Sequence, residues 1–503
     1  YGKPVAIRKN RQAAGTRKRS NGYQSSAAYS SPSSSGRPVT RQPTRRRGAT
    51  AHTHTRHRAF PASRLASATT APPRPVMPAL ANLLSRPAGW LAAAVFALLD
   101  ALDVLLCLVY GVLDGLLEDS PVACYCHRTH GAEGVSDTLY VRRSAFRDAL
   151  LGLLRRVGVG RRKNKKDASP EKARSPRWSD CGCGACLAWR STGGGGDRLH
   201  FVVNEPKDAA ATGREDDAIF VHGFTSSSAF WAQTVFPELA TANRRLLAVD
   251  LLGFGDSPKP ANCAYTLRDH VEAIERSVID PLDITSFHLV SHSMGCIVAL
   301  ALAAKHPARV KSITLVAPPY FLPCGEKASQ VALRRLAEKK LWPPLLFGSA
   351  VMSWYEHVGR TVCLVICKNH RAWEWLIRTV TRTSGVDFVV RDLTRHTHHS
   401  AWNTMHNVIC GGAETQDRNL EALAAAGVPV RVVHGDRDQV VPVECSSRHL
   451  KSKLPRAEIR IVGGQDHRTV VFGREKEFAE ELRDFWSACE KPTMDASGCA
   501  GGC

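Results

Sequence analysis

Short apolar runs alternate with longer stretches of helical periodicity from residue 199 to near the end of the chain. The short runs predict strands at 199–203, 218–221, 246–250, 287–291, 310–317, 428–434 and 457–462. The longer stretches predict helices at 267–278, 294–305 and 476–489. Strands that alternate with helices form a mostly parallel sheet with helices on both faces, so we expect an α/β fold.

Residues 322–426 break this alternation because they are helical in texture and rich in Trp, Arg and His. We interpret them as a helical cap inserted between two late strands, where a lid could exclude water from a site. The predicted core then comprises residues 199–321 and 427–489, and residues 490–503 form a flexible tail.

The basic charge of the chain is unevenly distributed. The net charge is +22, and residues 1–76 contain no Asp or Glu. We expect this segment to be a disordered extension, because it cannot bury enough apolar surface to offset its ordering entropy. It has the composition of an organelle transit peptide; alternatively it is absent from the working protein, since Met77 precedes the first hydrophobic run. Surfaces that bind nucleic acids usually combine basic residues with aromatic residues on which the bases stack. The basic residues of this segment are not combined with aromatic residues in that way, so we expect no nucleic-acid partner.

We interpret residues 77–120 as a hydrophobic signal or anchor segment. Two apolar stretches, 90–99 and 104–113, are separated by Asp100 and Asp103, and neither is long enough alone to cross a bilayer, which takes about 20 residues. A helix would carry Asp100, Asp103 and Asp114 on one face. This pattern favours a signal-type apolar region followed by an amphipathic helix at the membrane surface. A helix packed in the core is the alternative.

The chain has 16 cysteines, which suggests an oxidising compartment. Cys124, Cys126, Cys181, Cys183 and Cys186 fall in a linker region, residues 121–198. They could form disulfides or bind zinc. We favour disulfides, because zinc knuckles usually show two C-x-x-C pairs and this spacing does not.

A polar cluster between an apolar run and a helix of small residues marks the candidate nucleophile. Ser293 lies in Ser291-His-Ser293-Met-Gly295, with small residues two positions before and after it. This is the spacing of a nucleophile elbow, a strained turn from strand to helix. Ser291 replaces the more common glycine, which we expect to strain the elbow slightly.

A nucleophilic serine needs a base, and the base needs an acid that orients it. Asp438 and His467 each follow a predicted strand, in the order Ser, Asp, His. All three side chains should meet at one edge of the sheet, although Asp466 beside His467 leaves open which carboxylate pairs with it. The backbone N–H groups of Phe224 and Met294 are the expected oxyanion donors.

The remaining candidates are expected to be structural. His222 and His434 would fix loops, and His292 would point away from the nucleophile. A further group could bind metal, but no carboxylate or thiol accompanies it at ligand spacing, so we predict no metal or cofactor. That group is His396, His398, His399 and His406. Cys296 should lie in the core.

Several motifs in this order resemble the α/β-hydrolase superfamily over residues 199–488. They are His222-Gly-Phe224, residues 250–257, the Ser293 elbow, 435–438 with 441–442, and 464–467. The segments 124–127, 181–186, 396–402 and 405–410 further resemble the plant BODYGUARD group. That resemblance implies a lysophospholipase or acyl-handling enzyme of cuticle formation, located outside the cell at the wall.

We therefore expect a serine hydrolase that cleaves a lipid or acyl ester through an acyl-Ser293 intermediate. An acyltransferase would share that intermediate, and a non-catalytic receptor of the same fold is the third possibility. The expected partners are a lipid or acyl ester and a membrane or cell-wall surface. The expected location is secreted, in the cell wall or at the plasma membrane, or an organelle if residues 1–76 are a transit peptide.

Overall fold

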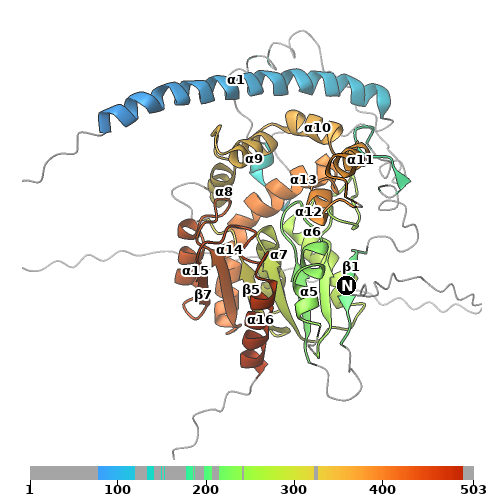
Figure 1. Ribbon diagram of the computed structural model, residues 1–503, viewed down its shortest axis with the longest axis vertical. Coiled ribbons are helices and arrows are strands. Elements are labelled where there is room, and N and C mark those ends of the chain that lie inside the picture. The colour runs from blue at the N-terminus through green and yellow to red at the C-terminus, as the bar shows by residue number, and fades with distance from the viewer. Residues whose placement is uncertain are drawn as a thin grey trace, which may run out of the picture. The chain divides into compact units, whose positions relative to one another are not determined.

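A seven-stranded sheet forms the centre of the protein in the computed structural model (Figure 1). The structure describes residues 78–118, 133–140, 149, 152, 177–184, 186, 198–206, 215–240, 243–321, 327–383 and 385–490. The strand order is β1-β3-β2-β4-β5-β6-β7, and only the pairing of β1 with β3 is antiparallel. The strands are β1 (Phe201–Asn204), β2 (Asp217–Val221), β3 (Leu246–Val249), β4 (Phe287–His292), β5 (Val310–Val316), β6 (Val430–Gly435) and β7 (Glu458–Val462). All seven predicted strands are confirmed.

Helices cover both faces of this sheet, as the periodicity predicted (Figure 1). Along β2, Ile219 and Val221 point into the core beneath α7, whereas Ala218 and Phe220 point into the core beneath α16. Because both faces are covered, the strand reads as an unbroken apolar run. The helices of this layer are α4 (Ala229–Ala232), α5 (Val235–Glu238), α6 (Leu267–Ile274) with the π-helical turn η4 (Glu275–Ile279), α7 (Met294–Lys305), α14 (Gly411–Ala425), η6 (Val443–Cys445), α15 (Ser447–Lys453) and α16 (Glu475–Glu490).

The segment between β5 and β6 is helical, as expected for a cap. Its helices are α8 (Ala328–Leu336), α9 (Pro344–Trp354), α10 (Glu356–Val365), α11 (His370–Thr381), α12 (Phe388–Asp392), α13 (His398–Thr404) and η5 (Met405–Cys410). The chain returns to the sheet layer at α14, where a Cβ on Gly412 would lie 2.6 Å from Ile297 Cγ2. The short 3-10 helix η2 (Asp137–Leu139) contacts η5, since Ser136 N, just before η2, donates to Asn407 Oδ1.

The apolar N-terminal segment forms one continuous helix, α1 (Pro78–Leu117), which lies along α10 of the cap (Figure 1). Asp103 Oδ1 accepts a hydrogen bond from His357 N at 2.8 Å. Asp114 binds Arg360 through both oxygens, at 2.8 and 2.7 Å. Burial would raise the pKa of Asp114, but the hydrogen bonds and charge of Arg360 outweigh burial and lower it. The predicted acidic face of the helix is thus the face that docks on the cap.

The opposite face of α1 is apolar and exposed. Its exposed residues include Trp90, Leu91, Leu98, Leu102, Leu105, Val109, Val112, Leu116 and Leu117. By length and composition, Gly89–Leu117 could cross a membrane. The predicted extension 1–76, Cys124, Cys126 and the tail 491–503 lie outside the described residues.

The buried pair between Asp114 and Arg360 should be a main anchor of α1. We expect Arg360→Ala to lower the free energy of unfolding by about 3 kcal/mol, because it leaves a buried carboxylate without its bidentate partner. Urea unfolding and limited proteolysis within α1 would measure this. Arg378→Ala is the matched control, since that side chain is 49% exposed. Equal losses in the two variants would contradict this role for the pair.

Candidate active site

The turn from β4 into α7 carries Ser293 in a backbone conformation that L-residues rarely adopt, with φ +52° and ψ −124°. Two backbone hydrogen bonds hold this turn: Ser293 N donates to Val316 O, and Cys296 N donates to Ser293 O, both at 2.9 Å. The positive φ of the elbow falls on Ser293 and not on Ser291, and a contribution of Ser291 to the strain of the elbow stays a prediction. The strained turn projects Ser293 from the carboxyl edge of the sheet.

Gly295 is required by close packing of α7 on β2. A Cβ at this position would lie 2.5 Å from His222 O and 2.8 Å from Val221 O, both rigid backbone atoms. Cys296, one residue further, is fully buried, which confirms its predicted place in the core.

The structure brings the three predicted side chains together. Ser293 Oγ lies 3.0 Å from His467 Nε2, and His467 Nδ1 lies 2.7 Å from Asp438 Oδ2. Ser293 follows β4, Asp438 follows β6 and His467 follows β7, so the predicted convergence at one edge of the sheet is confirmed. In this arrangement the imidazole can accept the serine proton while its Nδ1–H donates to the carboxylate.

Asp438 is fully buried and remains ionised because four groups donate to it. The N–H groups of Val440 and Val441 bind Oδ1 at 2.8 Å each, and His467 and His434 bind Oδ2. Burial would raise the pKa of Asp438, but hydrogen bonds from the two histidines outweigh burial and lower the pKa well below its ordinary value.

His434 is a site residue whose second role the sequence prediction missed. Its Nε2 lies 3.1 Å from Asp438 Oδ2 and 2.8 Å from Val441 O, and its Nδ1 lies 2.6 Å from Ser447 Oγ. The predicted role of fixing a loop is confirmed, and the same ring also orients the acid. The sequence offered one clue to this contact, because His434 lies only four residues before Asp438.

Asp466 does not compete for His467. Its Oδ1 accepts from the N–H groups of Arg468 and Thr469, at 2.8 Å each. The hydrogen bond from the Thr469 N–H is the main cause of the lowered pKa of Asp466. Asp466 therefore closes its own turn, and Asp438 is the carboxylate that pairs with His467.

His292 binds the backbone of His467. Its Nε2 lies 2.9 Å from His467 O, and its ring stacks on Phe230 with centroids 4.9 Å apart. Burial lowers the pKa of His292 to about 3, so the ring is neutral near pH 7. The imidazole that binds Ser293 Oγ is that of His467, which agrees with the prediction against a role of His292 as base.

The loop after β2 places the predicted oxyanion donor Phe224 beside the elbow. A Cβ on Gly223 would lie 3.2 Å from Ser293 Cβ, so the loop backbone runs against the nucleophile. His222 fixes the loop as predicted, because its Nδ1 lies 2.7 Å from Gly223 O and its Nε2 accepts from Leu251 N at 2.9 Å. The other predicted donor, the N–H of Met294, begins α7, where an N–H has no carbonyl of its own helix to bind.

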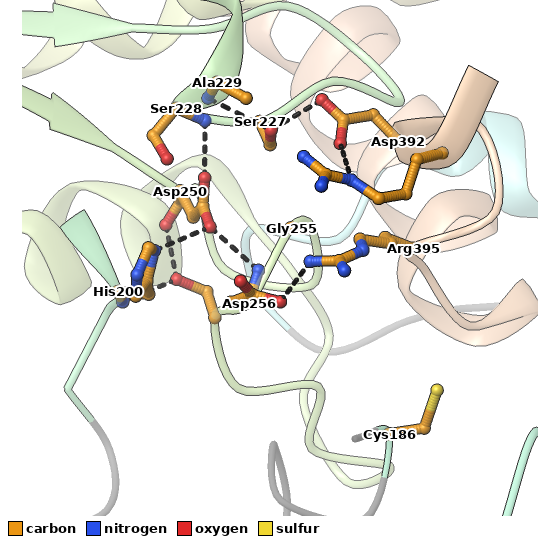
Figure 2. Close-up of polar contacts among 12 residues, drawn as sticks. Cys186, His200, Ser227, Ser228, Ala229, Asp250, Gly255, Asp256, Asp392 and Arg395 are labelled. Carbon is orange, nitrogen blue, oxygen red and sulfur yellow. Dashed lines mark hydrogen bonds and ion pairs between the residues drawn. The ribbon is translucent and has the colours of Figure 1, made fainter. Parts of the chain in front are cut away.

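The buried carboxylate of Asp250 holds the far end of this loop (Figure 2). It accepts from Ser228 N at 2.5 Å, from Asp256 N at 2.8 Å and from His200 Nδ1 at 2.9 Å. Figure 2 also shows Ser227 Oγ donating to Asp392 Oδ2 at 2.5 Å, which joins the loop to α12 of the cap. The loop after β2, residues 222–228, is called the oxyanion loop below. It is thus held both by the hydrolase core and by the cap.

The predicted histidine group in the cap is mostly structural. His399 Nε2 lies 2.9 Å from Cys263 O, and His406 Nδ1 lies 3.0 Å from Thr138 Oγ1. No thiol accompanies the group at ligand spacing in the sequence, but the folded chain brings two thiols close to His396. The Nε2 of His396 lies 3.8 Å from Cys363 Sγ and 3.7 Å from Cys367 Sγ. These two cysteines lie in the last turn of α10 and just after it.

Comparisons with known proteins agree with this architecture. The family profile described as alpha/beta hydrolase fold matches residues 219–467. The chain is 48% identical over 411 residues to "Probable lysophospholipase BODYGUARD 4" of Arabidopsis thaliana, covering 79% of this chain and 97% of that protein. It is 46% identical over 426 residues to "Probable lysophospholipase BODYGUARD 5", covering 79% and 95%, and 40% identical over 457 residues to "Probable lysophospholipase BODYGUARD 1", covering 80% and 96%, both of the same plant.

The fold and the site thus define an α/β-hydrolase that acts on esters. Within that class, the chain belongs to the BODYGUARD family.

Two neighbouring carboxylates allow a matched test of the acid. We expect Asp438→Asn to slow the reaction of Ser293 with a fluorophosphonate by about a thousandfold or more, because His467 loses the partner that fixes its tautomer. Asp466→Asn should change the rate by less than about twofold, since an amide oxygen can still accept the bonds of its turn. Intact-mass labelling over time gives both rates, and comparable losses would contradict the assignment of Asp438.

Proposed function

We propose that the protein hydrolyses a lysophospholipid through a covalent acyl-Ser293 intermediate. The observation that carries the proposal is the continuous hydrogen-bonded chain from Ser293 through His467 to the ionised Asp438. The names of the relatives support the substrate class. Cuticle formation is the process that the resemblance to the BODYGUARD group implies for this activity.

In the first half-reaction, Ser293 Oγ attacks the ester carbonyl while His467 Nε2 takes its proton. The N–H groups of Phe224 and Met294 stabilise the oxyanion of the tetrahedral intermediate. Collapse breaks the bond to the alcohol, and the imidazolium returns the proton to that leaving alkoxide. Asp438 stabilises the imidazolium between these two transfers.

In the second half-reaction, a water molecule attacks the acyl-Ser293 carbonyl while His467 accepts one of its protons. The intermediate collapses, Ser293 regains its proton from His467, and the fatty acid leaves. The net reaction consumes one ester and one water and yields one acid and one alcohol.

The proposed reaction is tested by mass spectrometry of the full chain. A fluorophosphonate should add once per chain and release its fluoride, and Ser293→Ala should abolish the adduct, whereas the neighbouring Ser291→Ala should keep it. The wild type should release fatty acid from lysophosphatidylcholine, and Ser293→Ala should reduce that rate by about a thousandfold or more. An adduct that persists in Ser293→Ala would refute the nucleophile. Unlabelled enzyme that reacts with the fluorophosphonate but releases no fatty acid from lysophospholipid would refute the substrate class.

We further propose that the protein binds a membrane surface through α1 and the cap. The polar face of α1 is occupied by Arg360 and His357, so the helix can present its apolar face to lipid without leaving the cap. The cap adds exposed large apolar residues in α9 to α11 and the turn before α9, among them Trp342, Leu345, Trp375 and Val380. An enzyme held this way would meet lipid substrates at the bilayer surface, and a wall or plasma-membrane location would agree with it.

Substitutions on the exposed face of α1 test membrane binding. We expect Leu98→Ser with Leu105→Ser to weaken binding to phosphatidylcholine vesicles by about tenfold or more, because each leucine contributes roughly a factor of ten when it enters lipid. The matched control is Val203→Ser with Ile461→Ser, two exposed residues on the edge strands β1 and β7. Vesicle sedimentation measures both. Equal binding of the two variants would contradict the surface, and protein that alkaline carbonate cannot extract from membranes would indicate that α1 crosses the bilayer instead.

A further inference from the structure

Three thiols and one imidazole meet between the segment before the hydrolase core and the cap. The thiols are Cys181, Cys183 and Cys186, and the imidazole is His370, the first residue of α11. The four potential ligand atoms all lie within 4.8 Å of one another. The three cysteines are free thiols, so the expectation that they form disulfides is wrong for them.

We propose that these four residues bind a structural Zn²⁺ ion. Three cysteines and one histidine are one of the closed ligand sets of structural zinc sites. A tetrahedral ion at ordinary Zn–S and Zn–N bond lengths would set the histidine nitrogen about 3.6 Å from each sulfur. His370 Nε2 lies 3.5 Å from both Cys183 Sγ and Cys186 Sγ. Two of the ligand separations therefore match a tetrahedral site, and Cys181 Sγ lies within 4.8 Å of the other three ligand atoms.

The neighbours of the four residues support coordination. His370 Nδ1 lies 3.0 Å from Glu374 Oε1, one turn along α11. A ring that donates its Nδ1–H to this carboxylate presents the Nε2 lone pair to the thiols, which is the usual outer contact of a zinc-bound histidine. The N–H of Cys183 also donates to Cys181 Sγ at 3.4 Å, which keeps the first two cysteines close together.

A disulfide accounts for this cluster less well than a metal ion does. Pairing any two of the three thiols leaves the third free and gives His370 no role, whereas one ion uses all four ligand atoms. The C-x-C-x-x-C spacing is unlike a pair of zinc knuckles because the fourth ligand comes from a helix 184 or more residues away.

A second group offers the nearest alternative location. Cys363, Cys367 and His396 provide three ligand atoms, and together with Cys181 and Cys186 they line one small cavity. Among the described residues this second group has one ligand fewer than a closed structural site needs. The proposal therefore assigns the ion to the group that contains His370.

The site would join the segment that carries the three cysteines, residues 178–186 and called the cysteine segment below, to the cap. Two neighbouring hydrogen bonds join the same two parts of the chain. Lys368 Nζ of the cap donates to Trp178 O at 2.7 Å, and Arg360 Nε of the cap donates to Ser179 Oγ at 3.2 Å. The ligand group and the triad share no residue, and among the described hydrogen bonds none joins them. Loss of the ion should consequently lower stability and leave the labelling of Ser293 intact.

Metal analysis of the full chain, purified without chelator, tests the site. We expect one zinc per chain, and Cys183→Ser, Cys186→Ser and His370→Gln should each lose it. Cys445→Ser, a partly exposed thiol elsewhere, should keep the zinc. His370→Cys retains a closed set of four ligands and should also keep it, which distinguishes coordination from a general need for histidine. The variants that lose zinc should unfold at a lower temperature and still react with a fluorophosphonate.

Three results would overturn the proposal. The first is wild-type protein that binds no zinc even after reduction and exposure to stoichiometric Zn²⁺. The second is a disulfide within residues 181–186 in a non-reduced peptide map. The third is zinc that is lost on Cys363→Ser and kept on Cys183→Ser, which would place the ion in the other group.

Discussion

The strained turn at Ser293 is the constraint on which the active site depends. A non-glycine residue held at φ +52° costs of the order of 1–3 kcal/mol, which the surrounding structure must offset. It does so by enclosing the turn: β4 pairs with β2 and β5, Ser293 N donates to Val316 O, and α7 packs so closely on β2 that only glycine fits at position 295. The serine is therefore presented by a rigid sheet rather than by a mobile loop.

The remaining parts of the site are positioned by buried, fully bonded carboxylates. Asp438 has four donors, and Asp250 binds the end of the oxyanion loop as well as His200 and Asp256. Burial would raise the pKa of Asp250, but its hydrogen bond and charge interaction with His200 lower it below the ordinary value. Where such a carboxylate has fewer donors the balance reverses: burial raises the pKa of Asp392 to about 6. Asp392 joins the cap to the loop after β2. Its carboxylate is therefore protonated more easily than that of Asp250 at the other end of the same contact network.

The cap, α1 and the cysteine segment form a second layer of organisation outside the hydrolase core. Arg360 connects all three, because it lies in α10 and binds Asp114 of α1 and Ser179 of the cysteine segment. The same arrangement turns the apolar face of α1 away from the cap, where its residues are exposed. The contacts that hold α1 on the cap thus involve other residues than those of the triad.

Local pattern by itself determined the seven strands, the start and end of α7, and the set Ser293, Asp438 and His467, because periodicity and the position of a residue after a strand are properties of short segments. It could not determine that Asp438 rather than Asp466 pairs with His467, since both lie near the same edge and only the packed loops exclude one of them. It also could not show that Cys183 meets His370, 187 positions away, or that the acidic side of α1 faces Arg360. Those contacts join segments whose order in the chain carries no information about their distance in space, so only the tertiary structure decided them.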